Sequence, residues 1–183
     1  MAYTFSTDWF TAHEQTWLEH VVPRLPRPCS WLEIGSHEGR SAVFMLDRVL
    51  SSADTLVCVD TWAGPFDGFA ATDAELRFDA NVAGRAEKHK ATSLDFLAAS
   101  VLAGRQFDGV YIDGDHAATS VLTDSVLAWH VLRPGGVIVW DDYGYSRGDQ
   151  LPPRLAIDRV LELYGERLTV LHIGWQVIAE KYR

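Results

Sequence analysis

Segments typical of β-strands alternate with segments typical of amphipathic helices along most of this chain. Strands are predicted at residues 30–35, 55–60, 107–114 and 136–142, with a short one at 88–93. Helices are predicted at residues 39–50, 73–84, 94–104, 117–132 and 152–165. This alternation predicts a mostly parallel sheet with helices on both faces. The runs "VYI" and "VIVW" are apolar throughout, which is typical of strands buried on both sides.

The two ends of the chain add to this core. Residues 7–21 carry apolar side chains at helical spacing, with Ser6 or Thr7 as the expected N-cap. Residues 168–183 look like two strands joined tightly near Gly174, without the helix that a parallel connection needs. We therefore expect an α/β fold: a Rossmann-like, doubly wound sheet of about seven strands whose last strand is antiparallel.

Length, composition and net charge limit the number of domains and the kinds of partner that this chain can have. A chain of 183 residues that is 48% hydrophobic can bury one sizeable core. We expect one domain over residues 1–183, with an N-terminal helix and Pro-rich connector at 1–28 and the cofactor-binding core at 29–183. A net charge of −9 without a basic run argues against nucleic acid and anionic membranes as partners.

Localisation follows from what the sequence lacks. No stretch approaches the roughly 20 apolar residues of a membrane span, and the first residues lack the pattern of a signal peptide. We expect a cytoplasmic protein with a small-molecule partner. A homo-oligomer also fits this short chain, with the N-terminal helix acting as a lid or as the subunit contact.

The loop "LEIGSHEGRS" follows the first predicted strand and carries two glycines, Gly35 and Gly39. Glycines there let a ligand approach backbone N–H groups at a helix N-terminus, although a plain turn would also use them. The dinucleotide pattern G-x-G-x-x-G is broken by His37 and Arg40. Asp60 ends the second strand 25 residues after Gly35, where an acid can accept ribose hydroxyls or can simply cap a loop. Together these residues indicate a ribose-containing cofactor.

Four carboxylates follow the next two long strands. Asp113 and Asp115 lie in "YIDGDH", and Asp141 and Asp142 lie in "VIVWDDY". Because the carboxyl ends of neighbouring parallel strands open into one crevice, we expect the four acids to lie close together. Unpaired, they would repel one another, and a divalent cation such as Mg²⁺ would reconcile their charges. Alternatively, Asp142 caps a turn and Asp115 caps the helix that starts near Ala117.

The segments "LEIGSHEGRS", "VCVDTW", "YIDGDH" and "LRPGGVIVWDDY" together resemble the class I S-adenosylmethionine-dependent methyltransferases. Glu33, Gly35, His37 and Gly39 stand where that family has E/D-x-G-x-G-x-G, with histidine replacing the middle glycine. More narrowly, the set is similar to metal-dependent O-methyltransferases of small molecules, including macrolide and aminocoumarin sugar methyltransferases. The resemblance covers roughly residues 30–180.

The resemblance implies S-adenosylmethionine (SAM) as the cofactor and assigns residues to it. It implies that the methionine end lies over the first loop, the ribose on Asp60, and the adenine near Thr61, Trp62 and Ser93. The residues implied to bind SAM are Glu33, Gly35, Ser36, His37, Gly39, Ser41, Asp60, Thr61, Trp62, Ser93 and Asp113.

The resemblance also implies a catalytic arrangement for the acids. Asp113, Asp141 and Asp142 would be the ligands of Mg²⁺ or another divalent cation, and Asp115 the general base, with His116 as the alternative base. Such a site would activate a hydroxyl for methyl transfer. The acceptor would be a small metabolite or a sugar-bearing natural product. Candidate acceptor walls are the loops after the second and fifth strands, with Trp62, Phe66, Phe69, Tyr143 and Tyr145.

Three other functions compete with this interpretation. An NAD(P)-dependent oxidoreductase is disfavoured by the broken glycine pattern and by the clustered acids. A metal-dependent phosphohydrolase is suggested by "DGD", but its nucleophilic aspartate normally follows the first strand, where this chain has Gly35. A non-catalytic SAM-binding partner subunit is the third, and it would bind cofactor without turnover.

Overall fold

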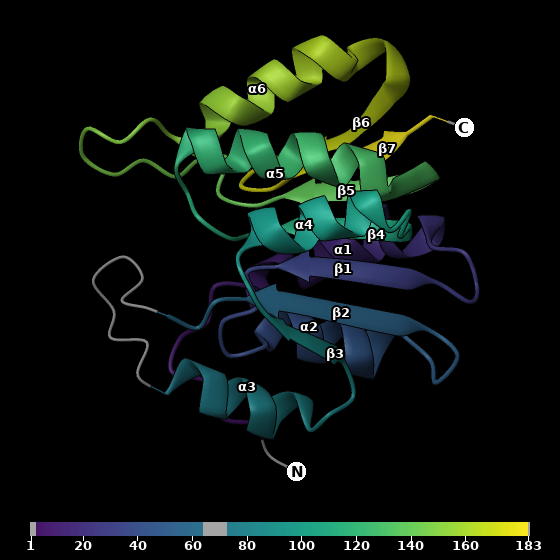
Figure 1. Cartoon of the computed structure of the whole chain (residues 1–183), viewed down its shortest axis with the longest axis vertical. Helices are drawn as coiled ribbons and strands as arrows, with labels where there is room; N and C mark the ends of the chain where they lie inside the picture. Colours follow the sequence, from purple (N-terminus) through teal and green to yellow (C-terminus); the bar gives the residue numbers. More distant parts are fainter. Residues whose placement is uncertain (1–2, 64–72, 183) are drawn as a thin grey trace.

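The computed structural model of this chain describes residues 3–63 and 73–182 and builds them around one seven-stranded sheet (Figure 1). The strand order is β3-β2-β1-β4-β5-β7-β6. The strands are β1 (Ser30–Ile34), β2 (Thr55–Asp60), β3 (Glu87–Lys90), β4 (Phe107–Ile112), β5 (Leu132–Trp140), β6 (Leu168–Ile173) and β7 (Val177–Lys181). Strands β1 to β5 pair in parallel, whereas β7 is antiparallel to both β5 and β6. The predicted fold class, including the antiparallel last strand, is confirmed.

Helices cover both faces of the sheet (Figure 1). One face carries α4 (Ser93–Leu102), α5 (Ala118–Val131) and α6 (Pro153–Tyr164). The other carries α1 (Glu14–His20), α2 (Arg40–Phe44), which continues as the π-helical η3 (Met45–Val49), and α3 (Ala74–Val82). Short 3₁₀ turns complete the helical elements: η1 (Thr11–His13), η2 (Val22–Arg24) and η4 (Gly165–Arg167). Within residues 3–63 and 73–182, none of the helices has the length and apolar character to cross a membrane.

Alternating side chains of the central strands build two separate cores, one on each face. In β1, Leu32 and Ile34 face the α4–α5–α6 side, and Trp31 faces the α1–α2 side. Trp17 of α1 is fully buried there, with its ring 4.9 Å from that of Tyr111. The N-terminal helix is therefore packed into the core of the sheet and is not a detached lid.

Two local predictions are corrected. Helical structure at the N-terminus begins at Thr11, not near Thr7, because the Asp8 carboxylate accepts the Thr11 N–H at 3.0 Å and so caps the first turn. The residues before Thr11 are held by the loop between β1 and α2, because the Ser6 N–H and the Ser6 hydroxyl both donate to the Glu38 carboxylate. The short strand β3 ends at Lys90, and Ser93 is the first residue of α4, with the Thr92 hydroxyl accepting the Asp95 N–H.

Candidate functional site

The carboxyl ends of β1, β2, β4 and β5 open into one cavity of about 950 Å³. Backbone hydrogen bonds continue past the strand ends and keep the strands in register. The Asp113 N–H donates to the Ile34 carbonyl at 2.8 Å, and the Asp141 N–H donates to the Ile112 carbonyl at 3.0 Å. The predicted site residues that line this cavity are Gly35, His37, Asp60, Thr61, Trp62, Ser93, Asp113, Asp115, His116, Asp141 and Asp142.

The remaining residues predicted to bind cofactor lie behind the first loop. Ser36 and Ser41 line a smaller cavity of about 50 Å³, which also borders Gly35, His37 and Asp113. Glu33 and Gly39 line neither of these two cavities. The structure therefore brings the first-loop residues and the acids to the same end of the sheet, as the pattern of strands predicts.

The first loop keeps the backbone shape of a glycine-rich turn despite its histidine. Gly35 and Gly39 have φ angles of 86° and 80°, and His37, at the motif's middle glycine position, also has a positive φ of 44°. A β-carbon at Gly35 would lie 1.9 Å from the main-chain oxygen of Asp113, so only glycine allows the β1 and β4 loops to approach this closely.

Asp60 joins the first loop to the loop after β2. Its carboxylate accepts the His37 N–H and the Trp62 N–H, each at 2.8 Å. The Trp62 indole in turn donates to the His37 carbonyl at 2.8 Å and packs against Phe78. Each Asp60 oxygen keeps capacity for a further hydrogen bond, because a carboxylate offers about four acceptor sites. Trp62 is mainly buried, so it supports the loop as well as lining the cavity.

Glu33 is a fully buried carboxylate beside this loop. The Ser36 and Ser41 hydroxyls neighbour its carboxylate, although neither Glu33 nor Ser36 completes a hydrogen bond of good geometry in the described chain. Burial raises the pKa of Glu33 to about 8; the two hydroxyls oppose the rise and the Asp60 carboxylate adds to it. A buried carboxyl with incomplete hydrogen bonds is costly in its charged form.

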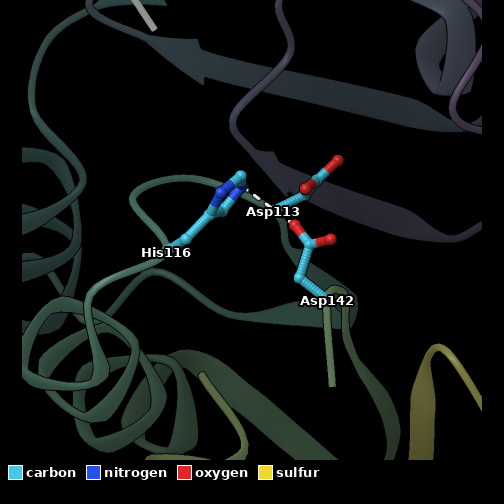
Figure 2. A group of neighbouring side chains, drawn as sticks. All are labelled: Asp113, His116 and Asp142. Atoms are coloured by element: carbon cyan, nitrogen blue, oxygen red, sulfur yellow. Dashed lines mark ion pairs between the residues drawn. The ribbon is translucent and has the colours of Figure 1, made fainter. Parts of the chain in front are cut away.

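Three side chains from two loops converge at the tips of β4 and β5 (Figure 2). Asp113, His116 and Asp142 each present one potential ligand atom, and these atoms lie within 4.8 Å of one another. The His116 Nε2 and Asp142 Oδ2 atoms are 2.9 Å apart. Burial raises the pKa of Asp113 well above its usual range, with the Asp141 and Asp142 carboxylates adding to the rise. Two of the four acids, Asp113 and Asp142, therefore converge as expected, and His116 joins them.

Asp141 lies beside this group but not in it. Its carboxylate accepts hydrogen bonds from the Tyr111 hydroxyl, from Gln176 Nε2 at 2.9 Å and from the Asp142 N–H at 2.6 Å. The predicted ligand set of Asp113, Asp141 and Asp142 stays a prediction: Asp113 and Asp142 lie in the cluster together with His116, and Asp141 lies next to it. Protein donors hold Asp141 from three sides, which leaves it as a support beneath the cluster.

Asp115 points to the start of α5. Its oxygens accept the Ala117 N–H at 3.1 Å and the Ser120 hydroxyl at 2.6 Å. Although Asp115 lines the cavity, these contacts match the alternative in which the side chain organises a helix start. The predicted base is thus held away from the three-residue cluster, and His116 is the titratable side chain that replaces it there.

The predicted acceptor walls are only partly found. Tyr145 lines the cavity, with its ring 4.7 Å from that of His116. Tyr143 turns to α6, where its hydroxyl donates to Asp158 at 2.7 Å. Phe66 and Phe69 lie outside the described residues. The sequence analysis did not single out several other lining residues, among them Trp9, His13, Ser120, Arg147 and Trp175. Trp9 and Trp175 come from the two ends of the chain, and their large aromatic side chains were the available signal.

Comparisons with known proteins agree with this geometry. A family model described as a methyltransferase domain matches residues 32–143, more than half of the chain. The fold is similar to that of an O-methyltransferase from Bacillus cereus in complex with S-adenosylhomocysteine (SAH). Identity to it is 22% and the TM-score is 0.68, over 99% of this chain and 84% of that one. No curated protein matches the sequence significantly.

Two biosynthetic enzymes have the same fold. The O-methyltransferase TomG from Streptomyces achromogenes, involved in tomaymycin synthesis and in complex with SAM, is 21% identical with a TM-score of 0.66, over 92% of this chain and 80% of that one. The MycE methyltransferase from the mycinamycin pathway, in complex with Mg, SAH and mycinamycin VI, is 18% identical with a TM-score of 0.67. The match covers 98% of this chain and 51% of that one.

Proposed function

This chain belongs to the methyltransferase-domain family, and we propose that it transfers a methyl group from SAM to a hydroxyl of a small metabolite or sugar-bearing natural product, assisted by Mg²⁺ or another divalent cation. The observation that carries the proposal is the cluster of Asp113, His116 and Asp142 at the wall of the 950 Å³ cavity. It combines two carboxylates that can ligate a cation, Asp113 and Asp142, with the His116 imidazole, which can accept a proton.

The cofactor half of the cavity fits SAM through groups that are on the chain already. SAM, when bound, supplies an electrophilic methyl group on a sulfonium sulfur. Asp60 has spare acceptor capacity for ribose hydroxyls. Ser36 and Ser41 line the small cavity beside the first loop, where their hydroxyls offer polar contacts to the methionine end of the cofactor. The similar structures from Bacillus cereus and Streptomyces achromogenes hold SAH and SAM, which supports the same ligand here.

The cation would be held by Asp113 and Asp142. Hard divalent cations prefer oxygen ligands, and Mg²⁺ uses one or two carboxylates while it keeps water and substrate as further ligands. A bound cation of this kind lowers the pKa of a coordinated hydroxyl. Burial raises the pKa of Asp113, and the neighbouring Asp141 and Asp142 carboxylates add to the rise; a bound cation would offset both effects. The similar MycE structure contains Mg, which supports the assignment.

His116 is the proton acceptor in this proposal. Its Nε2 is 2.9 Å from Asp142, and its side chain is 15% exposed, so the ring is held in place at the cavity wall. Asp115 is less suited to this role because two donors at the start of α5 engage its carboxylate. In the transfer the carbon–sulfur bond breaks, the carbon–oxygen bond forms, and the hydroxyl proton passes to His116. A general base contributes about 10²–10⁴-fold to such a reaction.

The test is a SAM-dependent assay with Mg²⁺ on a panel of phenols and glycosides, following both SAH and methylated product by mass spectrometry. His116→Ala should lower kcat by about 10²–10⁴-fold and keep SAH and Mg²⁺ affinity within a few-fold. A comparable loss of Mg²⁺ affinity would make His116 a metal ligand instead. Tight SAH binding without product from any acceptor would favour the non-catalytic partner subunit.

A further inference from the structure

The turn between β6 and β7 brings two neighbouring side chains to opposite sides of the sheet end. Gln176 points inwards and is 1% exposed, with its carboxamide between the Trp17 indole and the Asp141 carboxylate. Trp175 points outwards, is 49% exposed and lines the 950 Å³ cavity. The same turn therefore binds Asp141 through Gln176 and adds the aromatic side chain of Trp175 to the cavity wall.

The Trp175 ring has a defined seat. Its main-chain oxygen accepts the Tyr143 N–H at 2.9 Å, which attaches the turn to the segment that follows Asp142. A β-carbon built on Gly144 would lie 2.9 Å and 3.0 Å from two carbons of the indole, so the ring rests against the bare backbone of that glycine. Any side chain at position 144 would force the indole to move. The position of Trp175 is thus linked to that of the acids.

The cavity around this ring suits an acceptor with an apolar face. Trp9, 55% exposed, lines the same cavity, with its ring 5.4 Å from that of His37. Tyr145 lies at the cluster, against His116. Small-molecule sites are typically lined by aromatic groups with a few polar groups that fix orientation, and large planar rings offer much contact area. Here the polar groups are the acids and His116.

We propose that Trp175 determines acceptor specificity: its indole stacks on the six-membered ring that bears the reacting hydroxyl. This inference rests on the proposed function and deepens it by naming the acceptor class. The shared chemistry is a ring with one flat, apolar face and hydroxyls at its edge, which both phenols and pyranosides provide. Stacking holds the ring while the edge hydroxyl meets the Asp113–His116–Asp142 cluster.

The experiment measures binding separately from turnover. SAH-loaded protein with Mg²⁺ is titrated with catechol, with methyl α-D-glucopyranoside and with glycerol as an acyclic control, by saturation-transfer NMR. At least one ring probe should bind the wild type. Trp175→Ala should weaken that probe at least tenfold, Trp175→Phe should recover most of the affinity, and SAH affinity should stay within twofold. Whichever ring probe depends on Trp175 identifies the source of the ring.

Gly144→Ala provides an independent arm because it displaces the indole without removing it, and it should weaken the same probe several-fold. Leu163→Ala, on the exposed face of α6, is the matched control and should change nothing. Ring binding that is unaffected by Trp175→Ala, or absent from the wild type, would overturn the inference. Ring binding that depends on Trp175 but yields no methylated product would keep Trp175 as a ring-binding residue and would count against methyl transfer to the hydroxyl of that ring.

Discussion

The Tyr111 hydroxyl donates to the Asp113 carboxylate across 2.9 Å. The same hydroxyl contacts Asp141, and Gln176 Nε2 donates to it at 3.3 Å. Burial raises the pKa of Tyr111 well above its usual range, and the two carboxylates add to the rise, so the phenol keeps its single proton. One buried hydrogen is therefore shared between two acids that stand at the ends of neighbouring strands.

Tyr111→Phe should weaken metal binding although it substitutes none of the proposed ligands, because it removes the hydrogen bond that the Tyr111 hydroxyl donates to Asp113. Groups that hold metal ligands in place typically contribute 10–100-fold to affinity, so Mn²⁺ or Mg²⁺ affinity should fall by about tenfold. Calorimetric titration of the metal measures it. Tyr143→Phe is the control, since that hydroxyl serves Asp158 on α6. Equal metal affinities for the two variants would contradict the supporting role of Tyr111.

The two adjacent aspartates after β5 should behave differently. Asp142→Asn should lower metal affinity at least tenfold with little loss of stability, because Asp142 faces the cluster. Asp141→Asn should mainly destabilise the fold, by about 1–3 kcal/mol, because the amide keeps only one acceptor oxygen and turns its NH₂ towards at least one of the three existing donors. Metal titration and urea unfolding of both variants separate the effects. The reverse pattern would restore Asp141 as a ligand.

Gly35→Ala should disrupt the junction between the first loop and β4. The new β-carbon would meet the Asp113 main chain at 1.9 Å, and its φ of 86° is strained for alanine. Gly104→Ala is a matched control with φ of 65° and no atom within 4 Å of the added carbon. We expect a cost of about 1 kcal/mol for the control and at least twice that loss for Gly35→Ala, with weaker SAH binding. Similar unfolding free energies would argue against the close approach.

Glu33 should make the stability of the cofactor-free protein depend on pH. Burial raises its pKa from an ordinary value of 4.5 to about 8 in the folded state, so folding favours the protonated carboxyl. The stabilisation is complete below pH 4.5 and is lost as the pH rises towards 8. Over that interval the advantage of Glu33→Gln over the wild type should grow by about 1.4 kcal/mol per pH unit.

Urea unfolding of wild type and Glu33→Gln at pH 5.5 and pH 7.5 measures this growth. The difference between the two proteins removes the contribution of the other titrating groups. A pH-independent difference would mean that the carboxyl is already satisfied in the folded chain.

Local pattern predicted the sheet because the period of apolar residues depends only on which faces are buried. The alternation from residue 30 onwards, and the missing helix near Gly174, were enough to predict seven strands with the last one antiparallel. The start of the N-terminal helix was missed because two competing contacts decide it. Ser6 donates to Glu38, 32 residues away, and the Asp8 carboxylate accepts the Thr11 N–H instead.

The sequence by itself determined that the acids of β4 and β5 would meet, since parallel strands bring their carboxyl ends to one edge. Only the tertiary structure decided which of them face the cavity. Tyr111 of β4 and Gln176 of the turn before β7 both donate hydrogen bonds to Asp141. The Ser120 hydroxyl of α5 donates to Asp115. His116 lies with Asp113 and Asp142 in the cluster. The donors to Asp115 are local, and the helix-cap alternative anticipated them, whereas Tyr111 and Gln176 reach Asp141 from 30 and 35 residues away. No local pattern encodes where such distant donors arrive.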